Sequence, residues 1–297
     1  MSPGCGRRAR RRWPAAEPVT PAPVHLFWAQ GLDDDAPPVV RAAVRAWRRL
    51  NPDREVRLLT AAEAAPVLRR GGFDLDGATI QVRADALRLC LLEQHGGIWA
   101  DASVLPRRPL ARWFDGQLDT GDLCAPRRGD PGRALSNWFL YAAPGDPLLA
   151  AWAEEARRYW HRPRALVRAM PVWRRRLHQR GPKTRPPAWY VTPGQGWSRP
   201  LHPYFWPHYL FTFRVLADPA LAARWQAAPR LPGGPLHALL ELRKAVADDA
   251  AFLARAPEAW RGAPIHKLNW RLDWPEPVLR RALGRAPRQD APAPALR

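Results

Sequence analysis

The segment DALRLCLLEQHGGIWAD, residues 85–101, joins a long apolar helical pattern to a short strand that ends on a carboxylate. Gly96 and Gly97 stop the helix, because glycine readily takes the backbone conformations that end helices and turn the chain. Residues 98–100 then form a buried strand, and Asp101 follows at its tip. A carboxylate in this place either caps the next turn or holds a ligand such as a divalent cation.

The helical pattern before the two glycines carries a narrow polar stripe. Gln81, Asp85 and Arg88 lie at i, i+4 and i+7, and apolar residues flank them on both sides. One interpretation is a surface ion pair between Asp85 and Arg88, worth only about 0.3 kcal/mol. Burying a charge without need is costly, so we favour a pair that faces a cavity shared with Asp101.

Strand and helix patterns alternate through the first half of the chain. Apolar runs predict strands at 24–31, 55–59, 98–101, 103–106 and 136–143, and amphipathic patterns predict helices near 36–52, 60–70 and 79–95. Thr60 and Glu63 are spaced like a capping box. This order is typical of an α/β fold with a mostly parallel central sheet and flanking helices, which binds ligands at the carboxyl ends of its strands.

The second half of the chain is more helical. Helical patterns cover 146–180, 214–228 and 236–256, and a last strand or loop is expected at 263–270. We expect one domain over residues 23–274. Arg- and Pro-rich composition predicts a disordered basic arm at 1–22 and a disordered tail at 275–297.

A net charge of +20 would attract anions such as nucleotide phosphates, acidic glycans or lipid headgroups. Lysine occurs only at 183, 244 and 267, so nearly all 47 basic residues are Arg, an excess that codon preference could equally explain. A nucleic-acid-binding protein is an alternative, but it would gather its charge in one patch, and here Arg is dispersed. We therefore regard a nucleic-acid partner as the weaker hypothesis.

Three cysteines without a CxxC pair favour a reducing compartment, so we expect a cytoplasmic protein. No run approaches the roughly 18 apolar residues of a membrane span. A peripheral contact of the basic arm with the inner face of a membrane remains an alternative. The sequence lacks the GxSxG and HExxH motifs of common hydrolases. A glycosidase would need two carboxylates flanking one bond, and Asp85 and Asp101 could in principle form such a pair.

ADALRLCLLEQHGGIWADASVLPRRPL resembles the signature of glycosyltransferases whose sugar-binding region contains a DXD motif, in the branch called capsular polysaccharide synthesis proteins. VHLFWAQGLDDDAPPVVRAAVRAWRRLNPDREVRLL and SNWFLYAAPGDPLLAAW resemble further blocks of this family, and HPYFWPHYLF and IHKLNW do so more weakly. The resemblance covers about residues 24–160. It implies a nucleotide-diphospho-sugar transferase (GT-A type) fold. It also implies transfer from a nucleoside-diphosphate sugar to a glycan, polysaccharide or lipid-linked acceptor, with retention of configuration and with a metal.

The resemblance also implies roles for single residues. Trp28, with Gln30 beside it, would hold the nucleotide base. Asp85 and Arg88 would contact the ribose, the donor sugar and the phosphates. Asp101 would anchor Mn²⁺ or Mg²⁺ on the diphosphate, so Asp101, Asp85 and Arg88 are the expected catalytic residues.

Four further residues are assigned by the same resemblance. Asn137 and Trp138 would line the donor pocket, although a core position suits Trp138 equally well. His266 would complete the metal shell, and Lys267 would lie near the diphosphate. In the aromatic segment 203–213, a platform for the acceptor is an alternative to a core segment.

The sequence departs from the family pattern at two positions. Ala84 replaces a serine on the helix, which the site should tolerate. The expected Asp-x-Asp is Asp101-Ala102-Ser103, so Ser103 would bind a metal weakly or through water. If the site binds a metal only weakly, other cations would have to take the place of the metal. A protein that binds sugar nucleotides without turnover is a third hypothesis.

Overall fold

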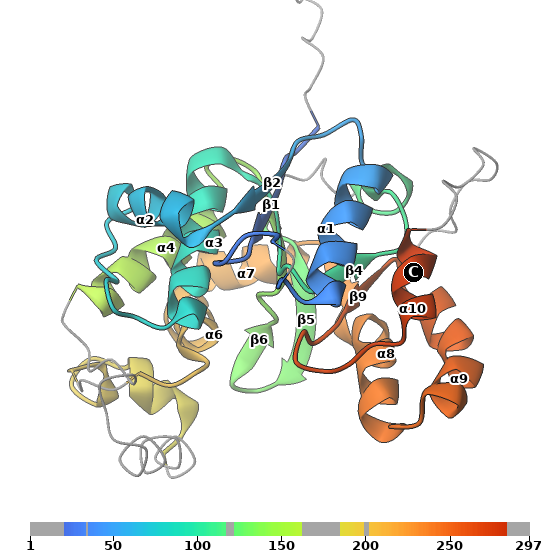
Figure 1. The fold of residues 1–297 in the computed structure, drawn as a ribbon. Helices are drawn as coiled ribbons and strands as arrows, with labels where there is room; N and C mark the ends of the chain where they lie inside the picture. The colour runs from blue at the N-terminus through green and yellow to red at the C-terminus, as the bar shows by residue number, and fades with distance from the viewer. Residues whose placement is uncertain (1–20, 34, 117–121, 162–184, 199–201, 284–297) are drawn as a thin grey trace, which may run out of the picture.

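The computed structural model describes residues 21–33, 35–116, 122–161, 185–198 and 202–283, and the fold is a mixed α/β arrangement with several sheets (Figure 1). The four-stranded sheet at its centre has the order β2-β1-β3-β7. Strand β1 is parallel to both β2 and β3, whereas β7 is antiparallel to β3. These strands are β1 Val24–Phe27, β2 Val56–Leu59, β3 Gly97–Ala100 and β7 Phe139–Ala142.

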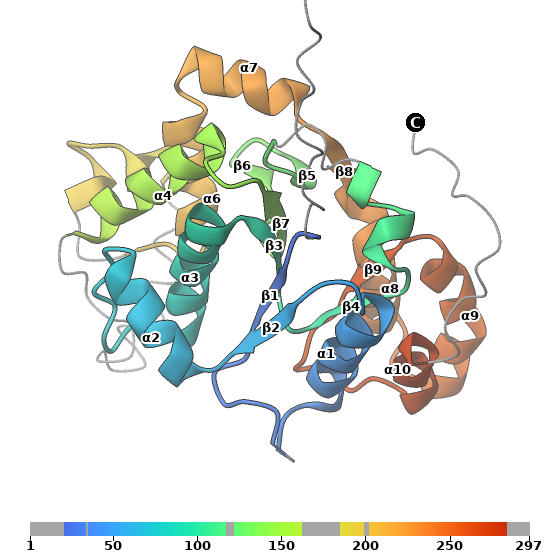
Figure 2. The ribbon, with the colours of Figure 1, turned by 90° about the horizontal axis from the view of Figure 1, so that it is seen from above.

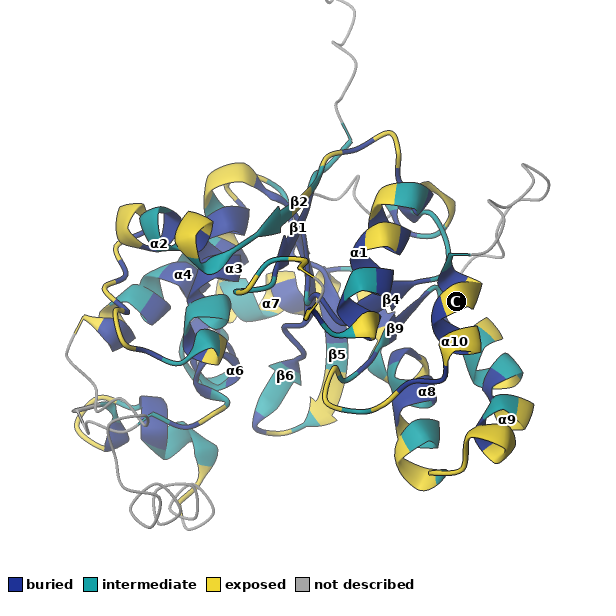
Figure 3. Cartoon of the chain, in the orientation of Figure 1, coloured by how far each residue is buried: buried dark blue, intermediate teal, exposed yellow. Residues whose placement is uncertain are grey.

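Helices cover both faces of this sheet, as the view from above shows (Figure 2). One face carries α2 Ala61–Arg70, α3 Ile80–His95 and α4 Pro147–Trp160. The other carries α1 Pro38–Leu50, with α8 Gly233–Ala245, α9 Asp249–Arg261 and α10 Glu276–Ala282 beyond it. The strands of the sheet are largely buried, and the outward faces of the helices are exposed (Figure 3). The apolar side chains of the strands therefore pack against helices on both faces of the sheet.

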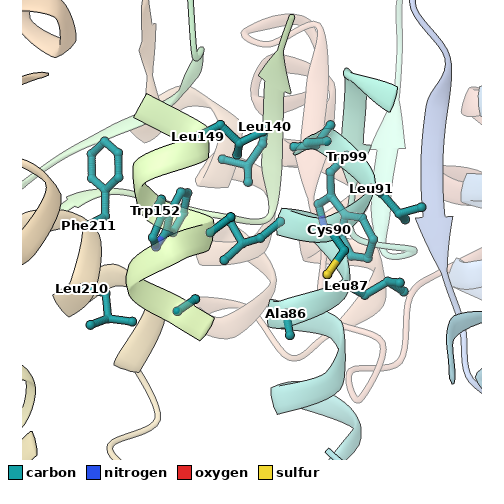
Figure 4. Packing of buried hydrophobic residues seen from close by; sticks show 14 of the residues in the cluster. Ala86, Leu87, Cys90, Leu91, Trp99, Leu140, Leu149, Trp152, Leu210 and Phe211 are labelled. Carbon is teal, nitrogen blue, oxygen red and sulfur yellow. The ribbon is translucent and has the colours of Figure 1, made fainter. Parts of the chain in front are cut away.

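The larger core lies between the sheet and helices α3 and α4 (Figure 4). Trp99 and Leu140 point from the sheet, Leu87 from α3 and Trp152 from α4. Trp152 also donates a hydrogen bond from Nε1 to the carbonyl of Pro207, 2.8 Å away. The aromatic segment therefore closes this core: α6 Trp206–Leu210 leads into a π-helical turn, Phe211–Val215, and then α7 Pro219–Ala227.

Two smaller sheets connect distant parts of the chain. β4 Val104–Pro106 pairs antiparallel with β9 Ile265–Lys267, so the predicted last strand lies beside the segment that follows Asp101. β5 Ala125–Asp130 pairs with β6 Arg133–Leu135 and with β8 Arg230–Pro232. The sequence did not predict the β6-β5-β8 sheet, because its strands are rich in polar residues and show no alternation of apolar and polar positions.

Local signals set several helix boundaries correctly. Thr60 and Glu63 form the predicted capping box, with Glu63 Oε2 2.7 Å from the Thr60 nitrogen. Gly96, at φ +61°, ends α3 as expected. The predicted helix at 236–256 is wrong in one respect, because it divides into α8 and α9, and Asp248 caps the second helix. Short 3-10 turns occur at Leu110–Arg112, Pro187–Val191 and Gly196–Ser198.

The predicted boundary at residue 274 is also wrong. The segment after Pro275 forms α10, which packs on α1 and buries Val278, Leu279 and Ala282. Composition indicated a disordered tail, but proline is tolerated in the first turn of a helix, and the apolar residues that follow supply the packing face. Residues 1–20 and 284–297, the remaining parts of the expected arm and tail, lie outside the described residues, as does 162–184, where the helical pattern beyond α4 was expected.

None of the helices in the described ranges combines the length and the apolar character that crossing a membrane requires.

Gly97 is needed where the chain enters β3. Its φ is +97°, and a Cβ there would meet the Pro23 carbonyl oxygen at 2.6 Å. That carbonyl accepts the Ile98 N–H at 2.8 Å. We expect Gly97→Ala to destabilise the protein by on the order of 3 kcal/mol, as backbone strain and steric overlap add.

Gly145→Ala is the matched control. Its φ is +77°, but no atom lies within 4 Å of the added Cβ. Backbone strain alone should cost about 1 kcal/mol there. Thermal unfolding of both variants measures the difference, and equal losses of Tm would contradict the assigned steric conflict.

Candidate functional site

Arg88 lies at the centre of a charged cluster at the carboxyl end of β3. Its side chain is 5% exposed, and Nη2 lies 3.0 Å from Asp85 Oδ1 and 3.4 Å from Asp101 Oδ1. Nη1 donates to the carbonyl of Asn137, and the guanidinium lies 5.0 Å from the centroid of the Trp99 ring. Arg88 is therefore not in a surface pair: it joins α3, the end of β3 and the segment before β7.

Asp85 lies on the α3 side of this cluster. Asn137 Nδ2 donates to Asp85 Oδ1 over 2.9 Å, so that oxygen receives both an amide and a guanidinium hydrogen. Burial raises the pKa of Asp85 to about 6, against the opposing charge of Arg88. The predicted stripe thus runs from exposed Gln81 through Asp85 to buried Arg88.

Asp101 lies on the other side of Arg88 and carries two more contacts. Its Oδ1 accepts Trp99 Nε1 at 3.1 Å, and its Oδ2 accepts Lys267 Nζ at 2.8 Å. Burial alone would raise the pKa of Asp101, but the charges of Lys267 and Arg88 outweigh it and lower the pKa. The carboxylate is thus held by other side chains, and the alternative of an Asx cap on the next turn is not observed.

Ser103 and Lys267 meet through the pairing of β4 with β9. Lys267 Nζ donates to Ser103 Oγ at 3.2 Å, and Ser103 Oγ donates to the carbonyl of Leu268 at 3.0 Å. The Lys267 ammonium therefore lies between the two residues expected to bind a metal.

The donor set here does not fit a divalent cation. Ser103 supplies a neutral hydroxyl whose proton is directed to Leu268, and Asp101 already accepts from Lys267 and Trp99. Divalent cations such as Mg²⁺ prefer carboxylate oxygens, and within the described ranges Asp101 is the one carboxylate in contact with Lys267. Across the described ranges, no group of three or more His, Cys, Asp or Glu side chains could hold a metal ion.

His266 is not brought to Asp101. Successive residues of a strand point to opposite sides, so His266 faces away from Lys267. Its ring stacks on Trp260 at 4.8 Å between centroids, and Nε2 lies 3.1 Å from the carbonyl of the same residue. Burial lowers its pKa to about 4. The assignment of His266 as a ligand beside Asp101 disagrees with this geometry.

Trp28 follows the end of β1, at the same edge of the sheet as Asp101. It is half-buried and meets Trp270 edge to face, with ring centroids 5.4 Å apart. Trp270 is 40% exposed, and the Arg271 guanidinium lies 4.4 Å from its ring centroid. Sequence reasoning missed Trp270, although it ends the quoted block IHKLNW. Gln30 is exposed in the turn after Trp28.

Asn137 and Trp138 differ in their surroundings. Asn137 belongs to the cluster through Asp85 and Arg88. Trp138 is a core residue that meets His237 edge to face at 5.3 Å. The two neighbouring residues therefore differ in their surroundings: the Asn137 amide contacts the charged groups, and the Trp138 indole lies in the core.

The aromatic segment divides in a similar way. Trp206 and Phe211 are fully buried, whereas Tyr204 is 72% exposed. The pKa of Tyr204 is raised, first by the loss of solvent around its hydroxyl and then by the charges of Asp85 and Asp101. The sequence did not distinguish this one exposed ring from its buried neighbours.

Further arginines surround the cluster. Burial lowers the pKa of His208 to about 3, and the charges of Arg88, Arg133 and Arg128 act in the same direction. Arg133 also lies over the Phe205 ring, 4.2 Å from its centroid. On the β5–β6 hairpin, Asp130 pairs with Arg133 at 2.5 Å and offsets part of this positive charge.

We expect Asp85→Asn to stabilise the protein as pH rises. Since the folded pKa of about 6 exceeds the ordinary 3.8, the folded state binds more protons between these values, and stability falls with rising pH. Asparagine cannot ionise, so the variant does not lose this stability. Between pH 4 and 7 its free energy of unfolding should rise relative to the wild type by on the order of 2 kcal/mol, and its relative Tm should rise accordingly.

Arg88, Asp101 and Asn137 all act on the pKa of Asp85 and contribute to this balance. Asp74→Asn, a change of an exposed carboxylate, is the control. If the relative Tm of Asp85→Asn instead fell with rising pH, attraction to Arg88 would outweigh burial, and the assigned cause would be wrong.

Comparison with known proteins gives two further similarities. The O-glycosyltransferase braB of Annulohypoxylon truncatum is 28% identical over 156 residues, which are 46% of this chain and 37% of that protein. The chain thus spans little more than a third of this relative's length. Among solved structures, the PaToxG glycosyltransferase aligns with a TM-score of 0.37 and 12% identity, over 83% of this chain and 89% of that one.

A family model described as capsular polysaccharide synthesis protein matches residues 14–168, just over half of the chain. The match contains β1, α3, β3 and the segment around Asn137, so it includes Asp85, Arg88 and Asp101. It confirms the resemblance found in the sequence. The chain therefore belongs to the capsular polysaccharide synthesis protein family.

Proposed function

We propose that this protein is a glycosyltransferase with a GT-A type fold. It moves a sugar from a nucleoside diphosphate to a glycan, polysaccharide or lipid-linked acceptor, with retention of configuration at the sugar. Family membership and the name of the curated relative support glycosyl transfer. The position of the cluster supports a donor site, because α/β sheets bind ligands at the carboxyl ends of their strands.

The observation that carries this proposal is the bridge from Arg88 to both Asp85 and Asp101. A nucleotide sugar offers hydroxyl groups, which carboxylates bind as hydrogen-bond acceptors, and phosphate oxygens, which guanidinium and ammonium groups bind. The cluster holds both kinds of group within contact distance. Asp101 and Lys267 are 28% and 19% exposed at their side chains, so a ligand can reach them.

In the reaction, the bond from the anomeric carbon to the diphosphate breaks, and the diphosphate leaves with the electron pair. A hydroxyl oxygen of the acceptor forms the new bond to the same carbon, and its proton goes to the oxygen of the departing diphosphate. The main task of the protein is to stabilise the charge of the departing diphosphate. Arg88 and Lys267 are the cations placed for this task, and Asp101 orients both.

The aromatic side chains supply the remaining binding surfaces. Trp28 and Trp270 form a pair at the end of β1, where an exposed indole can stack on the nucleotide base. Tyr204, exposed near Asp85 and Asp101, offers a ring on which an acceptor sugar can stack. Trp28 follows β1 and Tyr204 precedes α6, so the donor and the acceptor would contact different elements.

A screen of UDP- and GDP-sugars with the Arg88→Lys and Asp101→Asn variants tests the proposal. Lysine keeps the charge at 88 but cannot reach Asp85, Asp101 and Asn137 at once, so we expect transfer to fall at least about 100-fold. Asp101→Asn should lose a similar amount, because it releases Lys267. Both variants should still unfold cooperatively.

Arg280→Lys is the matched control for this screen. Arg280 pairs with Glu276 on α10 and is 74% exposed, so transfer should be unchanged. Donor binding without transfer in the wild type would instead favour the sugar-binding protein without turnover. Full activity of Arg88→Lys would refute the site.

Trp270→Ala should weaken nucleotide binding by about tenfold, the loss expected for one stacked aromatic ring. Calorimetric titration with UDP and GDP measures this change. Trp189→Ala is the control, since Trp189 contacts Tyr190 and Arg185, at a distance in sequence and structure from the Trp28 pair. An unchanged Kd for Trp270→Ala would remove the indole from the base site.

A further inference from the structure

Lys267 lies where the family pattern would place a divalent cation. We propose that the Lys267 ammonium replaces that cation and that this protein binds the donor diphosphate without a divalent metal, an inference that rests on the proposed function. The cation is thus part of the chain, carried on β9 and inserted between Asp101 and Ser103.

The contacts of Lys267 leave it free to bind one more group. An ammonium carries three N–H donors. One points to Asp101 Oδ2 at 2.8 Å and another to Ser103 Oγ at 3.2 Å. The third donor is available for a phosphate oxygen, and the side chain is 19% exposed.

Backbone pairing holds the ammonium in this position. Lys267 lies opposite Val104 in the β4–β9 register. Beyond the strand, Leu268 N–H donates to the Ser103 carbonyl at 3.1 Å, and Ser103 Oγ returns a hydrogen bond to the Leu268 carbonyl. These two reciprocal bonds fix the backbone that follows Lys267 against Ser103, the residue whose Oγ accepts from the ammonium.

The charge balance also fits the replacement. Two carboxylates and one divalent cation sum to zero, as one carboxylate and one ammonium do. Ser103 in place of the second aspartate removes one negative charge, and Lys267 in place of the metal removes one positive charge. A dication at this position would have to displace Lys267 from Asp101, the one carboxylate it could bind, and would then repel the displaced ammonium.

Arg88 completes the local cation set. It contacts Asp101 from the side opposite Lys267, through Oδ1 rather than Oδ2. The two cations thus flank one carboxylate. Arg88 is 5% exposed and already donates to the carbonyls of Ala84 and Asn137 and to both carboxylates, so it orients Asp101, and Lys267 offers the donor for a phosphate oxygen.

Calorimetric titration of the wild-type protein with UDP and with GDP tests the inference directly. We expect one of them to bind in EDTA, and Mn²⁺ or Mg²⁺ to change its Kd by less than about threefold. A Kd that tightens more than about tenfold with metal would overturn the inference. This comparison needs no variant, so it decides the question even if a substitution at 267 prevents folding.

Lys267→Met should weaken binding of the same nucleotide in EDTA by about 10- to 100-fold, the loss of a hydrogen bond to a charged group. Lys267→Arg keeps the charge and should retain part of the affinity. Lys244→Met is the matched control: Lys244 pairs with Glu241 on the exposed side of α8, and its loss should leave Kd unchanged. An unchanged Kd in Lys267→Met would contradict the role of the ammonium.

The two levels of the proposal fail differently. If neither UDP nor GDP binds with or without metal, the donor site itself is wrong, and the inference falls with it. If binding occurs only with metal, the sugar-transfer proposal stands and the replacement by Lys267 is refuted. The rate of sugar transfer by the wild-type protein in EDTA, measured in parallel, should equal its rate in Mn²⁺ within about threefold.

Discussion

The buried guanidinium of Arg88 is the constraint on which the site depends. Removing a charge from water is costly unless partners surround it, and Arg88 finds them on three elements: Asp85 on α3, Asp101 after β3 and the carbonyl of Asn137 before β7. The same contacts that offset its burial fix the helix against two neighbouring strands. The fold thereby holds the guanidinium rigid at the proposed donor site before any ligand arrives.

The helical second half of the chain serves the same site from a distance. Its strand β9 pairs with β4, so Lys267 meets Asp101 across 166 positions of sequence. The residues just beyond β9 bring Trp270 to Trp28 at the end of β1. Helices α8 and α9 pack around this strand and hold it in place. The polar centre therefore forms only when the first and last parts of the described chain fold together.

Sequence patterns predicted the local part of the site and missed the long-range part. Asp85 and Arg88 followed from helical spacing, and Asp101 from the glycine pair, because each signal lies within a few residues. No such signal records which strand pairs with β4, so only the family resemblance placed Lys267 near the diphosphate, and its contacts with Asp101 and Ser103 did not follow from the residues. His266 was expected in the metal shell beside Asp101, but its ring lies against Trp260 instead. Helix α10 was missed because its short apolar face lies in a segment whose Pro- and Arg-rich composition indicated disorder.

Two carboxylates on one guanidinium acquire different properties in this fold. Burial raises the pKa of Asp85 to about 6, whereas Lys267 and Arg88 overcome burial and lower the pKa of Asp101. Asp101 therefore stays an anion and an acceptor, which is what holding two cations requires. Asp85 can carry a proton near neutral pH and can then donate a hydrogen bond as well as accept one. A sugar hydroxyl, itself donor and acceptor, suits Asp85, and a phosphate suits the cations around Asp101.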